Sequence, residues 1–426
     1  MTKRNFIYGL LFIITSLTLP SCKTGSNTIG ETTTTNSKAS LKKPYVVLIS
    51  LDGFRWDYVE KYQPPHLSNF IKNGVQAESL TPSFPSKTFP NHYTIATGLY
   101  PDKHGIIGNA FYSYKKNVIY TIGNRVMVED GSFYGGTPLW VLADNHKMVS
   151  ASYFFVGSEA NVQGKRPTYF EKYDGSVKNE IRVKQSLEWF SLPPKNRPHM
   201  ITMYFSDMDD IGHKFGPNNE AEIKKALFAL DQNLGDFFKG VAATGLPIDI
   251  IIVSDHGMAT VKTENLIPID PIENELFYTA IDNGSMVNIH VKNESNMDSI
   301  FQLLTSKQNH FTVYKTANTP GFEYKPKNKD WGDIQVIPDF GYYFSKQSSI
   351  DTKIKNSLSE SGVHGYDPNF KEMHGIFYAN GPSFKKGLVV PSIKNIHVYP
   401  LICKILDLDI PKDIDGKLHQ LEGVLK

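Results

Sequence analysis

Two short segments of the sequence place a carboxylate beside an imidazole at a spacing that suits metal binding. Asp209 and His213 are four residues apart, and residues with this spacing share one face of a helix. Asp255 and His256 are adjacent, and the Gly257 that follows them permits a tight turn. Oxygen and nitrogen ligands without thiolates are compatible with zinc, manganese or iron. Both pairs therefore indicate a divalent-metal site, although a solvated acidic turn or a buried charge pair would leave the same spacing.

Other carboxylates extend this pattern. Asp207 and Asp210 compete with Asp209 as a metal ligand, because spacing alone does not separate the three. Asp52, which precedes Gly53, lies far away in the chain but also follows an apolar run. A buried aspartate is costly without a cation or several hydrogen-bond donors. If these carboxylates gather in one place, a pair of divalent cations is the simplest means of neutralising them.

A candidate nucleophile lies in the segment PSKTFPNH (85–92). Pro90 suits the first turn of a helix that residues 93–98 can continue. Thr88 would then lie at a helix N-terminus, where backbone N–H groups and the helix dipole favour an anion. A coordinated metal can lower the pKa of a hydroxyl enough for it to act as a nucleophile. The alternative role for this threonine is that of an N-cap.

Three apolar runs are expected to position these groups. They span residues 45–51, 199–205 and 248–254, and each leads into an acidic segment. Continuous apolar runs suit strands that are buried on both faces of a parallel sheet, whose carboxyl ends form the ligand-binding edge. Helical patterns at 179–190 and 219–238 alternate with the runs. This alternation predicts an α/β sandwich around a mostly parallel sheet, with a smaller inserted lobe at about 268–356, where the alternation weakens.

Charge and N-terminal composition narrow the class of protein. The chain has 45 basic and 43 acidic residues, and this balance argues against a nucleic-acid coating protein.

Lys3 and Arg4 precede an apolar run at 6–19, which is shorter than the about 20 residues of a spanning helix. The run leads into LPSC, which resembles a bacterial lipobox with lipidation of Cys22, although an ordinary signal peptide with an incidental cysteine would look similar. We predict a lipoprotein signal peptide at 1–22, a disordered tether at 23–43 and a catalytic domain at 44–426.

Seven longer segments occur in order along the chain and together span nearly all of residues 44–385. They are LISLDGFRWDY (48–58), PSFPSKTFPNHYTIATGLYPDKHGIIGN (82–109), TPLW (137–140), GKRPTYFEKYDGS (164–176), RPHMITMYFSDMDDIGHKFGP (197–217), IVSDHGM (252–258) and HGYDP (364–368). Together they resemble the nucleotide pyrophosphatase/phosphodiesterase family of the alkaline phosphatase superfamily. The resemblance implies an alkaline-phosphatase-like three-layer sandwich and a hydrolase that cleaves phosphodiester or pyrophosphate bonds of nucleotides.

The resemblance further implies a di-zinc site with Thr88 as the nucleophile. Thr88 would attack phosphorus to give a phosphothreonine intermediate, and hydrolysis of this intermediate would release a nucleoside 5′-monophosphate. Asn109 would donate a hydrogen bond to a phosphoryl oxygen. The ligands of one zinc would be Asp209, His213 and His364, and those of the other Asp52, Asp255 and His256, with Thr88 bridging toward the second ion.

Other histidines lie close to these in the sequence. His374, in the segment KEMHG, is a rival of His364, which we prefer because the family's ligand lies in an HG-aromatic-Asp segment. His374 would then pack beside a strand at 376–379. His92 and His104 also lie in matching segments, but they are not ligands in the family. We expect both to be hydrogen-bonded structural histidines.

The substrate class follows from aromatic residues. Phe89, Tyr173 and Tyr204 match substrate-binding positions of nucleotide-cleaving relatives, which hold the base between aromatic rings. Stacking accepts any base, so we expect modest base selectivity, although Tyr173 could instead pack against a turn.

A phosphomonoesterase would need further cationic clamps, for which only Lys87 and Lys165 are unassigned. A phospholipid-type phosphodiesterase and a non-catalytic metal- or nucleotide-binding lipoprotein are further alternatives, although lysophospholipid-cleaving members diverge or shorten in the segment at 164–176, and the full ligand set with Thr88 argues against a non-catalytic protein. We expect a monomer on the periplasmic or cell-surface side of a bacterial membrane.

Overall fold

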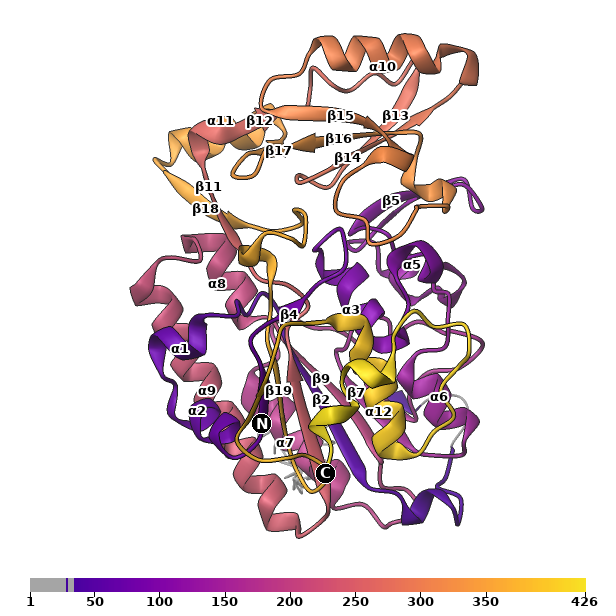
Figure 1. The fold of residues 1–426 in the computed structure, drawn as a ribbon, viewed down its shortest axis with the longest axis vertical. Helices are drawn as coiled ribbons and strands as arrows, with labels where there is room; N and C mark the ends of the chain where they lie inside the picture. The colour runs from indigo at the N-terminus through magenta and orange to yellow at the C-terminus, as the bar shows by residue number, and fades with distance from the viewer. Residues whose placement is uncertain (1–27, 30–33) are drawn as a thin grey trace, which may run out of the picture.

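The computed structural model of the chain describes residues 28–29 and 34–426. The predicted signal peptide and the lipidated Cys22 lie outside the described residues. The central element is a nine-stranded sheet, in which the neighbours from β8 to β10 run parallel (Figure 1). In spatial order the strands are β1 (Thr28–Ile29), β8 (Tyr169–Glu171), β7 (Ser150–Tyr153), β9 (Met200–Phe205), β2 (Tyr45–Leu51), β10 (Ile248–Val253), β19 (Phe377–Asn380), β3 (Val75–Ala77) and β20 (Leu388–Val390).

The three apolar runs of the sequence form the adjacent strands β9, β2 and β10. Ser50 pairs with Tyr204 on one side and with Val253 on the other, so the three strands end in register. Because they are parallel, Asp52 and the acidic segments after β9 and β10 meet at one edge of the sheet. The prediction that three strand ends gather at one edge is confirmed.

Alternating side chains of β2 belong to two hydrophobic cores. Val46 and Leu48 face one core, Val47 and Ile49 face the other, and all four are fully buried. Since both faces of the sheet are apolar, helices must cover both, which gives three layers. The first core is covered by α3 (Thr88–Thr97), α6 (Leu139–Asn145) and α12 (Val398–Leu406), and the second by α1 (Tyr58–Tyr62), α2 (Pro65–Lys72), α7 (Asn179–Phe190) and α9 (Glu220–Thr244) (Figure 1).

A second, antiparallel sheet lies beyond the carboxyl ends of the main sheet, at the top of Figure 1. It has a hydrophobic core of its own, built from residues between 269 and 344. One helix packs on this sheet through Ile300 and Leu304. The elements are β13 (Tyr278–Asp282), β14 (Val287–Val291), β16 (Ile334–Pro338), β15 (Phe311–Lys315) and α10 (Met297–Ser306), with the smaller pairs β11 (Ala259–Lys262) with β18 (Glu360–Val363) and β12 (Leu266–Pro268) with β17 (Tyr343–Ser345) beside them.

Residues 28–29 pair with β8 and residues 34–43 pack on the body, so the predicted disordered tether is wrong over these residues. The buried side chain of Asn36 donates to the carbonyls of Pro194 at 2.9 Å and Arg197 at 2.7 Å, and it accepts from the N–H of Val149 at 2.8 Å. This attachment is polar, and for that reason the low apolar content of the segment gave no sign of it. In the part of the chain that the structure covers, no helix is both long and apolar enough to cross a membrane.

Candidate active site

Three carboxylates meet at the carboxyl edge of the main sheet. Asp52 follows β2, Asp255 follows β10, and Asp209 lies in the first turn of α8 (Asp207–Phe215), after β9. Asp52 and Asp255 are buried, and Asp209 keeps 15% of its side chain exposed. Among the described residues, Asp52 Oδ1, Asp209 Oδ1 and Asp255 Oδ2 have no hydrogen-bond partner. Buried carboxylate oxygens without donors are costly, so this arrangement fits a bound cation.

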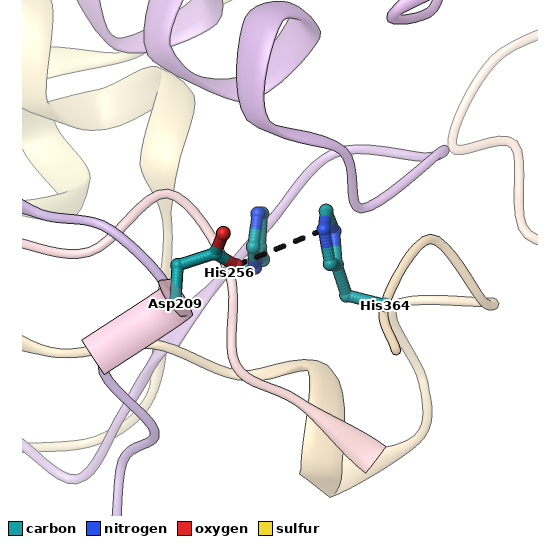
Figure 2. Close-up of side chains that lie close together, drawn as sticks. All are labelled: Asp209, His256 and His364. Atoms are coloured by element: carbon teal, nitrogen blue, oxygen red, sulfur yellow. Dashed lines mark ion pairs between the residues drawn. The ribbon is translucent and has the colours of Figure 1, made fainter. Parts of the chain in front are cut away.

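Three imidazoles direct their Nε2 atoms at these oxygens, and two of them, His256 and His364, are drawn in Figure 2. Nε2 of His256 lies 3.0 Å from Asp255 Oδ2. Nε2 of His213 lies 3.3 Å from Asp209 Oδ1. Longer approaches of the same kind are 3.4 Å from His256 to Asp52 Oδ1 and 3.8 Å from His364 to Asp209 Oδ1. The six predicted metal ligands therefore lie in one cluster.

The second nitrogen of each of these rings has the same kind of partner. Nδ1 of His213, His256 and His364 lies 2.8, 2.8 and 2.9 Å from a backbone carbonyl oxygen. An Nδ1–H that donates to a carbonyl fixes the tautomer and leaves the lone pair on Nε2 for a metal ion. All three rings show this pattern, and all direct Nε2 at carboxylate oxygens that have no hydrogen-bond partner among the described residues. The arrangement fits a metal centre better than a set of structural histidines.

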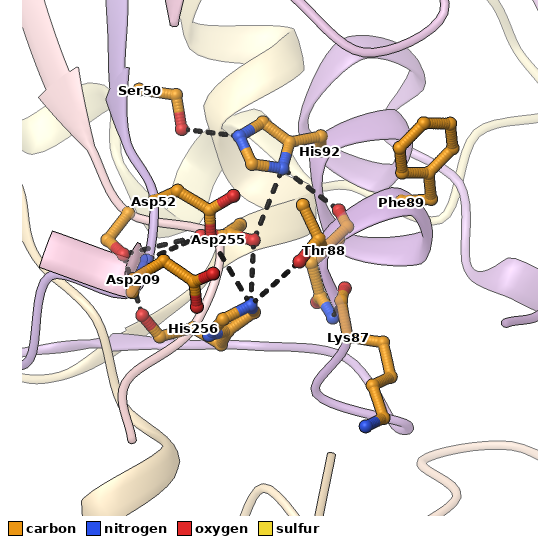
Figure 3. A network of polar contacts seen from close by, with 12 residues as sticks. Ser50, Asp52, Lys87, Thr88, Phe89, His92, Asp209, Asp255 and His256 are labelled. Carbon is orange, nitrogen blue, oxygen red and sulfur yellow. Dashed lines mark hydrogen bonds and ion pairs between the residues drawn. The ribbon is translucent and has the colours of Figure 1, made fainter. Parts of the chain in front are cut away.

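The other histidines are bonded differently. His92 borders the cluster, but its Nε2 is 2.8 Å from the hydroxyl of Ser50 and its Nδ1 is 2.9 Å from the carbonyl of Thr88 (Figure 3). His374 is hydrogen-bonded through both nitrogens to other groups, and so is His104. Both nitrogens of each of these three rings are hydrogen-bonded to hydroxyl or backbone groups that are not predicted metal ligands, which favours structural roles over metal binding.

The three acidic candidates for a metal ligand on α8 differ in their hydrogen bonds. Both carboxylate oxygens of Asp207 accept from the side-chain amide of Asn179, at 2.8 and 3.0 Å. Asp210 accepts from the hydroxyl of Ser206 at 2.9 Å. Only Asp209 of the three directs an unpartnered oxygen at the imidazoles.

Grouping the ligand atoms by distance alone gives two sets that differ from those implied by the family resemblance. Two sets of three ligand atoms lie within 4.8 Å of one another: Asp209 with His256 and His364 (Figure 2), and Asp52 with His92 and Asp255 (Figure 3). His92 is excluded by its two occupied nitrogens. His256 touches both sets, and its shortest approach is to Asp255. We therefore assign His256 to the set that contains Asp255, which restores two sets of three protein ligands.

The turn after β2 brings Asp52 against α8. Gly53 has φ +64°, and a Cβ there would lie 2.8 Å from the Cα of Asp209, so glycine permits the close approach of the two turns. Tyr204 donates its hydroxyl to Asp52 Oδ2 at 2.6 Å, which leaves Oδ1 facing the cluster. Tyr204, predicted to bind substrate, therefore also orients a carboxylate.

The electrostatics of the cluster favour a cation. Burial, followed by the charges of Asp255 and Asp209, raises the pKa of Asp52 well above its ordinary value. Burial, followed by the charge of His256, lowers the pKa of His364 well below its ordinary value. A divalent ion relieves both effects, because it stabilises the carboxylate and uses the neutral imidazole as a ligand.

Thr88 lies beside this cluster at the start of α3 (Figure 3). It is the first helical residue, Lys87 occupies the N-cap position, and no side chain makes a capping hydrogen bond. The alternative of an N-cap role for Thr88 is therefore wrong. Its Oγ1 is 3.2 Å from Nε2 of His256, so the hydroxyl adjoins the ligand set that contains His256.

Thr88 opens onto a cavity of about 330 Å³. Asn109 lies on its wall and accepts the N–H of Phe89 on Oδ1 at 3.1 Å, which leaves its amide hydrogens for a ligand. Phe89 and Tyr173 also line the cavity. The ring of Tyr173 is supported edge-on by Phe154 at 5.3 Å and Tyr204 at 6.1 Å between centroids. The cavity can therefore hold a flat apolar group next to a phosphoryl group.

Sequence reasoning missed further residues on this wall, including Arg125, Phe154 and Glu159. Phe154 has φ +67°, a left-handed conformation that is uncommon for a bulky residue and clusters at functional sites. Nothing in the local sequence signals that conformation. Arg125 and Glu159 lie in segments without a recognisable motif, and only the folded chain brings them together.

The assignment of His364 rather than His92 can be measured as metal content. If each set of three ligands holds one zinc ion, His364→Ala should reduce bound zinc from about two ions to about one per chain, because one set loses a third of its protein ligands. His92→Gln should keep both ions, since both ring nitrogens of His92 are hydrogen-bonded to groups that are not predicted metal ligands. Elemental analysis of the purified proteins checks this, with circular dichroism to verify folding. Equal metal loss in the two variants would contradict the assignment.

Comparison of the sequence with known proteins identifies one protein family. The sequence model of a family described as type I phosphodiesterase/nucleotide pyrophosphatase matches residues 46–367. Venom phosphodiesterase CdcPDE of Crotalus durissus collilineatus is 32% identical over 411 residues, which cover 92% of this chain and 48% of that protein. Human ectonucleotide pyrophosphatase/phosphodiesterase family member 5 is 31% identical over 365 residues, which cover 85% and 74%. The chain spans about half the length of the venom enzymes that it matches.

Solved structures agree in fold. Human ectonucleotide pyrophosphatase/phosphodiesterase 5 superposes with a TM-score of 0.82 at 30% identity, over 90% of this chain and all of that one. An inactive threonine-to-alanine variant of the murine protein, in complex with AMP, superposes over the same shares with a TM-score of 0.83. These likenesses confirm the predicted α/β fold class and the family resemblance.

Proposed function

The chain belongs to the type I phosphodiesterase/nucleotide pyrophosphatase family, and we propose that it is a metal-dependent hydrolase that releases nucleoside 5′-monophosphates from nucleotide diesters and pyrophosphates. The observation that carries this proposal is the Thr88 hydroxyl, 3.2 Å from His256 in a cluster of six metal-binding side chains. The AMP complex of the murine relative supports a nucleotide as the substrate class.

The proposed cofactor is a pair of zinc ions. Asp209, His213 and His364 would hold one, and the other ligands would be Asp52, Asp255 and His256, whose orphan oxygens and free Nε2 lone pairs suit the task. When bound, zinc would supply the positive charge that lowers the pKa of the attacking hydroxyl and offsets charge on the phosphoryl oxygens.

The reaction would proceed in two displacements on phosphorus. Thr88 Oγ1 loses its proton to solvent, attacks and forms an O–P bond, while the bond to the leaving oxygen breaks and that oxygen keeps the electron pair. The amide of Asn109 donates to a non-bridging oxygen, where negative charge accumulates. Water then attacks phosphorus, the Thr88 oxygen leaves and regains a proton, and the nucleoside monophosphate is released. Two inversions give net retention of configuration at phosphorus.

A phosphomonoesterase would need cationic clamps for the additional phosphate oxygens. Lys87 directs its amine away from the cluster (Figure 3), to the hydroxyl of Tyr343 at 2.9 Å. Lys165 pairs with Asp144. Neither lysine is among the residues that line the cavity. Among the described residues that line the cavity, Arg125 is the one lysine or arginine, and it is ion-paired with Glu159, so this arrangement favours diester over monoester hydrolysis.

The test of this function is a comparison of substrates with the zinc-loaded protein. We expect rapid release of p-nitrophenol from p-nitrophenyl esters of nucleoside 5′-monophosphates and at least about tenfold slower turnover of p-nitrophenyl phosphate. Analysis of the products of ATP cleavage should give AMP and pyrophosphate. Preferential hydrolysis of the monoester would contradict the proposal.

Stacking on Tyr173 can be tested separately. We expect Tyr173→Ala to raise KM for a p-nitrophenyl nucleotide ester roughly tenfold, because base–aromatic stacking contributes about 1–3 kcal/mol. Tyr173→Phe keeps the ring and should stay near wild type. The base-free diester bis(p-nitrophenyl) phosphate should be much less affected by Tyr173→Ala. Equal changes for both substrates would show that Tyr173 does not bind the base.

The lipid anchor at Cys22, the end of the signal peptide at residue 22, the periplasmic or cell-surface location and the monomeric state stay predictions from the sequence.

A further inference from the structure

One part of the cavity wall has no role in the proposed reaction. It is formed by α5 (Arg125–Glu129), which follows the hairpin of β5 (Ala110–Ser113) and β6 (Val118–Thr121) (Figure 1). Arg125 and Val128 of α5 line the cavity together with Ile122 and Glu159. This wall thus combines apolar side chains with one ion pair.

Glu159 joins α5 to the segment that carries Tyr173. The buried Glu159 accepts the N–H of Tyr173 on Oε1 at 2.9 Å, and its Oε2 forms an ion pair with Arg125 Nη2. A second ion pair, between Lys172 and Glu129 at 2.7 Å, joins the same two segments. Arg125 is thereby linked through Glu159 to the backbone of Tyr173, whose ring is positioned to stack on a base.

The guanidinium of Arg125 has N–H groups that make no ion pair with the described residues and can donate to a ligand. Its side chain is 42% exposed, and its two ion pairs with described residues, to Glu159 and to Glu129 at 3.8 Å, both use Nη2. The hydrogens on Nε and Nη1 therefore stay available. Both oxygens of Glu159 are engaged, so this part of the wall offers hydrogen-bond donors and no free carboxylate.

We propose that Arg125, positioned by Glu159, recognises the edge of the substrate's base and makes the enzyme prefer guanine to adenine. Guanine presents two adjacent acceptors, O6 and N7, which match a guanidinium, whereas adenine places a donor, N6, beside N7. Stacking between Phe89 and Tyr173 accepts either purine, so a preference must come from a contact with the edge. This proposal rests on the proposed function, and it replaces the modest base selectivity that stacking alone predicts.

The experiment compares kcat/KM for the p-nitrophenyl esters of GMP and AMP. We expect the wild-type ratio to be about 10 in favour of guanine, within the range of one bidentate base contact. Arg125→Ala should bring the ratio close to one, mainly through a higher KM for the guanine ester. Glu159→Gln keeps an acceptor for the Tyr173 N–H but loses the charge that holds Arg125, so the ratio should fall there too. Lys165→Ala, whose side chain pairs with Asp144 outside the cavity, is the matched control and should keep the wild-type ratio.

Calorimetric binding of GMP and AMP to a Thr88→Ala variant provides a second readout without turnover, and we expect the same preference. Thermal unfolding of each variant verifies that it is folded. Rapid cleavage of both nucleotide esters at a ratio of one, or an equal loss for both in Arg125→Ala, would overturn the guanine preference and leave the proposed function intact. Cleavage of bis(p-nitrophenyl) phosphate without cleavage of either nucleotide ester would overturn both proposals.

Discussion

Thr88→Ala is expected to lower kcat for a p-nitrophenyl nucleotide ester by about 10³-fold or more, because the nucleophile of a covalent mechanism is removed. The hydroxyl adjoins the ligand set that contains His256, and the substitution removes the oxygen that would form the proposed covalent intermediate. Folding should be little affected, because the Thr88 hydroxyl contacts His256 within the ligand cluster and Lys87, not Thr88, occupies the N-cap position. Initial rates at saturating substrate measure the effect.

Two controls give this prediction a sharp outcome. Thr88→Ser keeps a hydroxyl and should retain activity well above that of Thr88→Ala. Acid quenching of the wild type during turnover, followed by mass spectrometry, should detect a nucleotidyl group on the peptide that contains Thr88. A Thr88→Ala variant with wild-type turnover, or an adduct on another residue, would show that the mechanism is wrong. The inactive threonine-to-alanine variant of the murine relative is consistent with the expected loss.

Removal of metal is expected to abolish turnover and to lower the melting temperature by about 5 °C or more, since a ligand that binds only the folded state at 100-fold its Kd contributes about 2.7 kcal/mol per site. The physical reason is the set of orphan oxygens on Asp52, Asp209 and Asp255, which repel one another when no cation lies between them. Dialysis against a chelator, with differential scanning calorimetry before and after, measures the shift. Readdition of zinc should restore both activity and stability.

Variants of acidic residues show whether this stabilisation comes from the cluster. Asp255→Asn should reduce the chelator-induced shift, because it removes one ligand and one repelling charge. Asp207→Asn is the matched control, since both oxygens of Asp207 are occupied by Asn179, and its shift should equal that of the wild type. A chelator-induced shift that is the same in all three proteins would place the metal elsewhere.

The parts of the fold that depend on continuous apolar runs could be predicted from the sequence. β2 coincides with the run at 45–51, and α7 has the predicted bounds Asn179–Phe190. A strand buried on both faces needs apolar residues at every position, so its limits are visible in the sequence alone. The acidic residues that follow such strands are equally visible, and parallel pairing is enough to bring them to one edge.

Polar anchoring could not be predicted in the same way. Residues 34–43 have the composition of a tether, but amide and backbone hydrogen bonds of Asn36 attach them to distant loops. Such bonds depend on where the loops lie in space and not on local composition. The pairing of Arg125 with Glu159 has the same origin.

The sequence by itself determined which residue types could bind metal and attack phosphorus, because acidity, lone pairs and hydroxyl chemistry belong to the side chains. The tertiary structure alone decided which of these residues lie together with their lone pairs directed at one site. His92, His364 and His374 have the same imidazole, but only in His364 does a backbone carbonyl occupy Nδ1 while Nε2 faces an orphan carboxylate. The physical reason is that a ligand is defined by the direction of its lone pair, which the surrounding hydrogen bonds set and the order of residues along the chain does not.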